Sequence, residues 1–359
     1  MRIAIVGLGA VGEACAHALT ASEVARSLVL LNRTENVAPA IAADLRQARA
    51  WGRPLDTEVG SLDDWTLLQG CDLLLLTMGA RLRGDQDRSA IAVSTASLIR
   101  GNEECPGFLQ GLKQLRESQD EDSVPIVLVI SNPVEATVTW LLEQTEWPRH
   151  RMFGLGTTVE SARFSGFLAQ ELDVDAGSVW VDVVGEHGKR FVPLDVSRLQ
   201  AMFPKDKIEM ALDLAKQETL GAAQTIRAFS EELGKRRAAS VVEAIRQGLD
   251  GRLSGGDLDA VADWLADDLQ WRLAPPATRY AIAASANVVV RAVREDLNQV
   301  LTVSALPPPG LFEPQVALAL PFVVGRAGLG DCLIQKMPAV GQEAAEAISA
   351  QVSSMRDAE

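Results

Sequence analysis

Short apolar runs alternate with helical stretches along the N-terminal part of the chain, and this alternation constrains the fold more than any other feature. The runs and the helices that follow the first two are Ile3–Val6 with a helix from about Val11, Leu28–Leu31 with a helix through Leu45, Leu73–Met78, and Ile126–Ile130. Strands separated by helices form βαβ crossovers and therefore a parallel sheet. Because these strands are almost purely apolar, helices must cover both faces of the sheet. The sequence predicts an α/β fold with a doubly wound parallel sheet.

The pattern changes after about residue 150, which indicates a second domain. A chain of 359 residues also exceeds the usual size of one hydrophobic core. The later part mixes strands with longer helices, including a strand at Val179–Val184, a long helix containing Val288 and a closing amphipathic helix at Gly341–Met355. We predict a dinucleotide-binding domain over residues 1–147 and an α+β substrate domain over 148–359.

One stretch of the second domain is typical of an insertion. The turn Ser254-Gly255-Gly256 precedes an acidic helical stretch at Asp257–Leu273, and Pro275-Pro276 closes it. We predict a helical insertion at about 234–274.

Composition excludes several classes of function. A formal net charge of −14 disfavours nucleic acid as a partner, since it repels a phosphate backbone. The four cysteines are scattered without a CxxC pair or a Cys/His cluster, so neither a metal site nor a disulfide framework is indicated. No apolar stretch approaches the roughly 20 residues that span a bilayer, and no secretory signal precedes the first strand. We expect a cytoplasmic protein that binds no membrane.

A glycine-rich turn links the first strand to the first helix: Gly7-Leu8-Gly9-Ala10-Val11-Gly12. In this context Gly7 permits the tight turn, Gly9 lets the backbone approach a pyrophosphate, and Gly12 allows close packing of helix on strand. The N–H groups of the helix N-terminus, at Ala10 and Val11, then face the anion. The motif predicts a Rossmann-type dinucleotide site, although such glycines also occur in turns that bind nothing.

The end of the second strand indicates which dinucleotide is bound. An acid about 20 residues beyond the last glycine of the motif is typical of NAD sites. Asn32 occupies this position and is followed by Arg33 and Thr34. An uncharged Asn beside an Arg accepts a 2′-phosphate, so NADP(H) is favoured. The alternative is NAD, with Asn32 bound to the 2′-hydroxyl and Arg33 a solvated surface charge.

Four further segments carry a family resemblance. In chain order they are Thr77-Met78-Gly79-Ala80-Arg81 running to Arg88, Ser131-Asn132-Pro133-Val134-Glu135, Glu160-Ser161-Ala162-Arg163-Phe164, and Gly185-Glu186-His187-Gly188. They resemble the lactate/malate dehydrogenase family, whose catalytic loop, SNPVD, LDSAR and GEHG segments follow in that order. Ala42–Ala48 is similar to the family's interface helix and Val323–Gly328 to its late hairpin. The resemblance implies a nicotinamide-dependent 2-hydroxyacid dehydrogenase that forms a homodimer or homotetramer.

His187 is the candidate proton donor. Reduction of a 2-oxoacid needs a hydride at the carbonyl carbon and a proton at its oxygen, and histidine titrates near physiological pH. A carboxylate must hold the imidazole in its donor tautomer. The resemblance implies Glu160 for this role, where the family pattern has Asp.

The resemblance implies the remaining site residues. Arg163 shares a helix face with Glu160 and would bind the substrate carboxylate; the alternative is an i,i+3 surface ion pair. Arg88 would polarise the substrate carbonyl from a mobile loop. Asn132 would orient both nicotinamide and substrate. By position in their motifs, Thr77 and Gly79 would contact the cofactor, and Thr278, at the start of a substrate-lining helix, the substrate.

Substrate choice is left open by the loop. Leu82 occupies the specificity position and favours an apolar side chain on the 2-oxoacid, whereas a one-residue slip would place Arg81 or Arg83 there, opposite a second carboxylate. A second departure follows the histidine, where Lys189-Arg190 replace the usual Asp-Ser. These cations either act on the pocket or point to solvent.

Three rival functions remain. A related NAD-dependent glycosidase needs a metal-binding Cys where Ser131 stands. A non-catalytic dinucleotide-binding homologue would keep the glycine turn and lose the chemistry. A nicotinamide-dependent reductase of another carbonyl or imine would use the same proton donor.

Overall fold

The computed structural model describes residues 1–80, 87–102, 107–249, 278–334, 336 and 338–358. Contacts divide the chain into two compact units, a first unit of Met1–Lys216 and Tyr280–Glu359 and a second unit of Gln217–Arg279. The first unit holds the sheet and the hydrophobic core. The predicted boundary near Trp147-Pro148 falls between a helix and a strand of this first unit, and the division into domains at that point stays a prediction.

In the described part of the chain, eleven strands form one sheet in the order β3-β2-β1-β4-β5-β6-β9-β10-β7-β8, with β11 paired to β10. The parallel strands are β1 (Arg2–Val6), β2 (Ser27–Leu31), β3 (Asp56–Gly60), β4 (Leu73–Leu76), β5 (Ile126–Val129) and β6 (Met152–Gly154). The antiparallel strands are β7 (Val183–Gly185), β8 (Phe191–Pro193), β9 (Gln299–Ala305), β10 (Leu318–Gly325) and β11 (Gly328–Cys332). The order 3-2-1-4-5-6 of the parallel half is that of dinucleotide-binding sheets, which confirms the predicted fold class.

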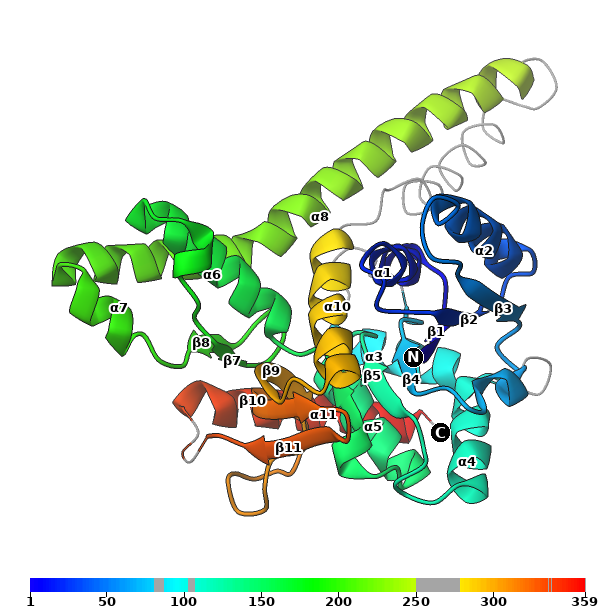
Figure 1. Ribbon diagram of the computed structural model, residues 1–359. Coiled ribbons are helices and arrows are strands. Elements are labelled where there is room, and N and C mark those ends of the chain that lie inside the picture. The colour runs from blue at the N-terminus through cyan, green and yellow to red at the C-terminus, as the bar shows by residue number, and fades with distance from the viewer. Residues whose placement is uncertain (81–86, 103–106, 250–277, 335, 337, 359) are drawn as a thin grey trace. The chain divides into compact units, whose positions relative to one another are not determined.

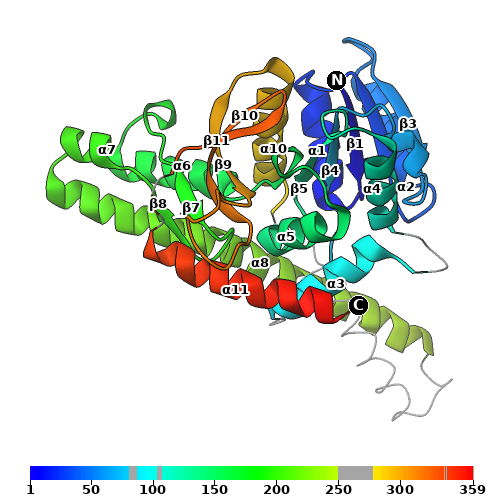
Figure 2. The ribbon, with the colours of Figure 1, turned by 90° about the horizontal axis from the view of Figure 1, so that it is seen from below.

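Helices cover both faces of the sheet (Figure 1). The helices of the described chain are α1 (Ala10–Ala21), α2 (Val37–Ala48), α3 (Arg88–Arg100), α4 (Phe108–Ser118), α5 (Val134–Thr145), α6 (Thr158–Leu172), α7 (Ser197–Met202), α8 (Lys205–Leu249), α10 (Tyr280–Glu295) and α11 (Ala339–Asp357), with single 3-10 turns at Trp65–Leu68, Arg149–Arg151 and Ala176–Ser178. Helix α1 packs against α10, whereas α11 packs against α3 and α5 beyond the strands (Figure 2).

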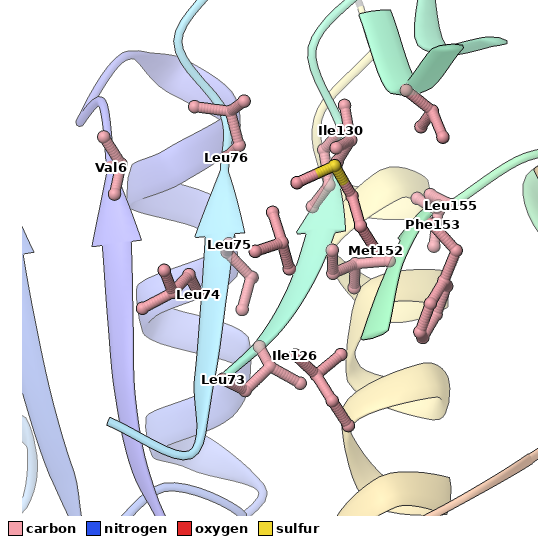
Figure 3. Packing of buried hydrophobic residues seen from close by; sticks show 14 of the residues in the cluster. Val6, Leu73, Leu74, Leu75, Leu76, Ile126, Ile130, Met152, Phe153 and Leu155 are labelled. Carbon is pink, nitrogen blue, oxygen red and sulfur yellow. The ribbon is translucent and has the colours of Figure 1, made fainter. Parts of the chain in front are cut away.

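The core lies between the parallel strands and these helices. Every side chain of β4 and all but one of β5 is fully buried. Figure 3 shows the side chains of β4, β5 and β6 packed together between the strands and helices. This burial explains why the central strands are apolar without alternation.

One strand was not predicted, and one predicted strand begins too early. The missed strand is β3 (Asp56–Gly60), whose sequence carries little apolar signal. Its residues can be polar because β3 is the edge strand and pairs only with β2. Val179–Asp182 was predicted as strand, and this is wrong, since β7 begins at Val183. The reason is that α6 side chains bind this backbone: Val181 N–H donates to Ser165 Oγ at 2.9 Å.

The second unit is described only in part. Within it α8 continues to Leu249, and Ala238 and Val242 are buried. The predicted insertion at 234–274 overlaps this unit, whereas its acidic stretch Asp257–Leu273 lies outside the described residues. Among the helices that the structure describes, none combines the length and hydropathy needed to cross a membrane. Cytoplasmic location stays a prediction.

Candidate active site

The glycine turn between β1 and α1 is built by three different constraints. Gly7 has φ of +96°, and a Cβ there would lie 2.8 Å from Met78 of the neighbouring strand end. A Cβ on Gly12 would overlap the carbonyl oxygen of Gly7. At Gly9, by contrast, a Cβ would meet nothing within 4 Å. Gly7 and Gly12 therefore shape the turn, while Gly9 leaves space above it.

That space belongs to a pocket of about 500 Å³ at the carboxyl ends of the parallel strands. Seven of the predicted cofactor residues line it: Gly7, Gly9, Asn32, Arg33, Thr34, Thr77 and Gly79. The sequence did not identify the apolar lining from Leu8, Val37, Leu62, Met78 and Leu98, nor the lining from Ser97, Gly101, Asn102 and Gly107. Ala10, Val11, Gly12 and Asn132 are not among the lining residues.

Asn32 is held by two hydrogen bonds at the end of β2. Its Oδ1 accepts from Leu8 N–H at 3.0 Å, and its Nδ2 donates to Thr34 O at 3.2 Å. Arg33 and Thr34 are exposed beside it. The side chain that follows this strand is therefore fixed, uncharged and turned toward the glycine turn.

Asn132 lies at the end of β5, where neighbouring side chains fix its backbone. Thr95 Oγ1 donates to Asn132 O at 2.9 Å, and Ser131 Oγ donates to Leu76 O at 3.1 Å and to Met78 O. Asn132 Oδ1 is buried and has no partner among the described residues. A buried acceptor without a donor is costly, so this atom is suited to an amide donor of a ligand. Together with the open space at Gly9, it fits a nicotinamide dinucleotide.

The centre of the site is a pair formed by His187 and Glu160. Glu160 lies in the first turn of α6 and is 2% exposed, and His187 follows β7 with its side chain 16% exposed. His187 Nδ1 and Glu160 Oε2 are 3.0 Å apart. The longer Glu side chain thus reaches the imidazole in the place where the family pattern has Asp. The structure brings together two predicted residues that are 27 positions apart.

Burial and charge oppose each other in this pair. Burial disfavours the imidazolium, but the Glu160 carboxylate and its hydrogen bond prevail and raise the pKa of His187 above its usual value. Burial likewise disfavours the carboxylate, yet His187 and Arg163 hold the pKa of Glu160 below its usual range. The pair therefore favours a charged imidazolium next to a carboxylate.

Arg163 lies one turn beyond Glu160 on the same face of α6. Its Nη1 is 4.0 Å from Glu160 Oε1, and its side chain is 14% exposed. This separation is too long for a good hydrogen bond, so the guanidinium has donors to offer to a ligand.

Arg88 begins α3 rather than lying within a loop, which corrects the predicted location. Its Nη1 donates to Glu186 Oε1 at 2.7 Å, and its Nη2 donates to His187 O at 2.8 Å. Arg88 is thereby fixed against Glu186 and the backbone of His187.

Two residues with direct contacts to this centre, Glu135 and Glu186, were not predicted as site residues. Glu135 is the second residue of α5. Its Oε1 accepts hydrogen bonds from His187 N–H at 3.0 Å and from Ser304 Oγ at 2.8 Å. Burial raises the pKa of its carboxyl group. Glu186 is fully buried and binds Arg88 and Arg190. For Glu135 the sequence did carry a signal, since an acid lies there between apolar neighbours. For Glu186 it carried none, because its partner Arg88 is too distant in sequence for the contact to be predicted.

Several predicted substrate residues have no structural description. Arg81, Leu82 and Arg83 lie outside the described residues. Thr278 is described but belongs to the second unit, so its role stays a prediction. Across the described ranges, no three or more His, Cys, Asp or Glu side chains are grouped to hold a metal ion.

Comparison with known proteins shows which family this chain resembles. The profile described as "lactate/malate dehydrogenase, NAD binding domain" matches residues 1–154. The chain is 27% identical over 329 residues to malate dehydrogenase of Thioalkalivibrio sulfidiphilus, covering 91% of this chain and 89% of that one. It is 28% identical over 346 residues to L-lactate dehydrogenase of Deinococcus radiodurans, covering 96% and 95%.

Solved structures agree on the fold. The crystal structure of Cryptosporidium parvum malate dehydrogenase superposes with a TM-score of 0.73 at 19% identity, covering 99% of each chain. The minor L-lactate dehydrogenase of Enterococcus mundtii gives a TM-score of 0.70 at 22% identity, covering 99% of this chain and 96% of that one. Residues 1–154 therefore match the NAD-binding domain of the lactate/malate dehydrogenase family, and the chain is similar to lactate and malate dehydrogenases along nearly its whole length.

Proposed function

We propose that the protein transfers a hydride between a nicotinamide dinucleotide and a 2-oxoacid or 2-hydroxyacid, with His187 exchanging the proton. The observation that carries this proposal is the pair of His187 Nδ1 and Glu160 Oε2 at 3.0 Å, with Arg163 and Arg88 beside it. An oriented imidazole flanked by two guanidinium groups suits an acid with a carbonyl next to its carboxylate.

The chain's own residues divide the work. The bound dinucleotide supplies the hydride to the carbonyl carbon during reduction. His187 gives the proton at Nε2 to the carbonyl oxygen, while Glu160 keeps the proton on Nδ1 and so fixes the tautomer. In the reverse direction the neutral imidazole accepts the hydroxyl proton at Nε2. Arg163 binds the substrate carboxylate with its planar fork, and Arg88 polarises the carbonyl.

For the cofactor we propose a preference for NADP(H). Asn32 carries no charge to repel a 2′-phosphate, and Arg33 and Thr34 line the same pocket. For the substrate we propose a 2-oxoacid with an apolar side chain, because Leu82 occupies the specificity position. We also propose that Thr278 contacts the substrate.

The test is a panel of 2-oxoacids with NADPH and NADH, followed by stopped-flow absorbance. We expect turnover with NADPH and a loss of roughly 10²- to 10⁴-fold in kcat for His187→Gln, the usual contribution of a general acid. His17→Gln, at an exposed position on α1, is the control and should leave kcat unchanged. Silence with every 2-oxoacid would leave a non-catalytic homologue or a reductase of another substrate, and a strong NADH preference would refute the cofactor proposal.

A further inference from the structure

Glu186 is a fully buried carboxylate that is shared by two arginines. Its Oε1 accepts from Arg88 Nη1 at 2.7 Å, and its Oε2 accepts from Arg190 Nη1 at 2.6 Å. Glu186 directly precedes His187, and Arg190 ends the same turn before β8. Two guanidinium groups and one carboxylate sum to one positive charge (2 − 1 = 1), so the cluster is not neutral.

The two arginines differ in their surroundings. The Arg190 side chain is 39% exposed, so water screens much of its charge, whereas the Arg88 side chain is 19% exposed. Arg88 also donates to the backbone His187 O at 2.8 Å, and its charge acts on the imidazole and on the buried Glu135 carboxyl. The less screened of the two positive charges therefore lies near His187.

We propose that Arg190 is a positioning residue, which neutralises Glu186 and thereby leaves the charge of Arg88 available to the substrate. Glu186 cannot remain without a counter-ion, because a buried carboxylate alone is costly. Without Arg190 the carboxylate would depend on Arg88 alone, and the pair would be neutral. This is a role for one of the two cations that follow the histidine, and the part that concerns the substrate rests on the proposed function.

The shared carboxylate is tested without any activity measurement, by thermal unfolding of Arg88→Gln, Arg190→Gln and the double variant. Either single variant leaves Glu186 one counter-ion and should lower Tm modestly. The double variant strands a buried charge, so its loss in Tm should exceed the sum of the single losses. With Glu186→Gln as background the excess should vanish. Additive losses in the wild-type background would overturn the sharing of Glu186.

Catalysis is tested with Arg190→Gln and a matched control in the same turn. Lys189 is exposed, and its backbone N–H donates to the backbone Glu186 O at 3.3 Å. Lys189→Gln therefore removes one positive charge, as Arg190→Gln does, and leaves the partners of the Glu186 carboxylate unchanged. We expect kcat/KM for the 2-oxoacid to fall about tenfold in Arg190→Gln, within the range for a misplaced catalytic group, and to hold in Lys189→Gln.

Two more variants separate this role from a purely structural one. Arg190→Lys restores the charge and should recover most of kcat/KM. The double variant Glu186→Gln/Arg190→Gln removes the carboxylate that would neutralise Arg88, and should be more active than Arg190→Gln alone. Equal losses in the Lys189 and Arg190 variants, or no recovery in the double variant, would overturn the proposal. If the wild type turns over no 2-oxoacid at all, the proposed function fails, while the unfolding measurements still decide the pairing.

Discussion

The Glu160 carboxylate, 3.0 Å from the imidazole of His187, is the group that does most to favour its charged form. The imidazolium is the acid for reduction, so kcat/KM for a 2-oxoacid should be high below the pKa of His187 and fall as the pH rises through it. Because Glu160 raises that pKa against the effect of burial, Glu160→Gln should lower it. We expect the fall in the pH profile of kcat/KM to begin at lower pH in Glu160→Gln.

Glu160→Asp is the control for that measurement, since it keeps the charge and shortens the side chain by one methylene. It should retain the pH at which the profile falls while losing some kcat through poorer reach. A profile for Glu160→Gln that coincides with the wild type would contradict the role of Glu160.

A second residue-scale prediction concerns the choice of cofactor. In Asn32→Asp one carboxylate oxygen can still accept Leu8 N–H, while the other would face Thr34 O and any 2′-phosphate. Repulsion should lower kcat/KM with NADPH by at least about tenfold relative to NADH, since each 1.4 kcal/mol is a factor of ten. Initial rates with both cofactors measure this ratio, and an unchanged ratio would place the 2′-phosphate elsewhere.

Sequence reasoning could propose residues that a motif marks, and it missed partners that the fold brings together from distant segments. His187 and Glu160 were each marked by their own segment. The bond from Arg88 to Glu186 joins residues 98 positions apart, and nothing local in either segment indicates it. Glu135 was within a quoted segment, but its contact with His187 depends on how α5 and β7 are placed.

At the scale of elements, different glycines of the turn from β1 to α1 serve packing and dinucleotide binding, and substitutions can distinguish the two roles. Gly12→Ala would push a methyl into the Gly7 carbonyl and should cost about 1–3 kcal/mol in the free energy of unfolding, as overpacking does. Gly9 has φ of −75° and open space at the Cβ position, so Gly9→Ala should leave stability nearly unchanged and weaken dinucleotide binding instead.

Urea unfolding and a fluorescence titration with NADPH distinguish the two variants. The expectation is a lower unfolding midpoint for Gly12→Ala, and a weaker Kd at normal stability for Gly9→Ala. The opposite assignment would mean that Gly9, not Gly12, is the packing position.

Strands were predictable where both faces are buried, because burial makes the whole run apolar. β1, β2, β4 and β5 are of this kind. β3 is an edge strand with exposed Asp56 and Glu58, so composition could not identify it. The stretch before β7 is largely apolar, but its backbone N–H groups bind hydroxyls of α6 and not a neighbouring strand. Hydropathy alone cannot distinguish these two kinds of partner.

At the scale of the whole molecule, the main hydrophobic core cluster is found in the first unit. Among the described residues, the main core cluster takes none of its members from 217–279. If the first unit holds its stability within this cluster, replacing residues 236–272 by a short Gly/Ser linker should change its free energy of unfolding by no more than about 0.5 kcal/mol.

Mass photometry of the same variant tests whether the second unit takes part in assembly. We expect the full chain to form the homodimer or homotetramer that the family resemblance implies. If the shortened variant forms an assembly with the same number of subunits, residues 236–272 have no role in assembly. A large fall in Tm would contradict the independence of the core.

The sheet passes without interruption from its parallel to its antiparallel half, through the pairing of Gly154 on β6 with Ser304 on β9. Ser304 also donates to Glu135, which accepts the backbone N–H of His187, so this pairing is linked to His187 through one side chain. A hinge between the halves would have to break these bonds. The groups that we propose for catalysis, on α5, on α6 and in the turn after β7, are therefore tied to one continuous sheet, so we expect discrimination among substrates to come from loops and not from movement between the two halves.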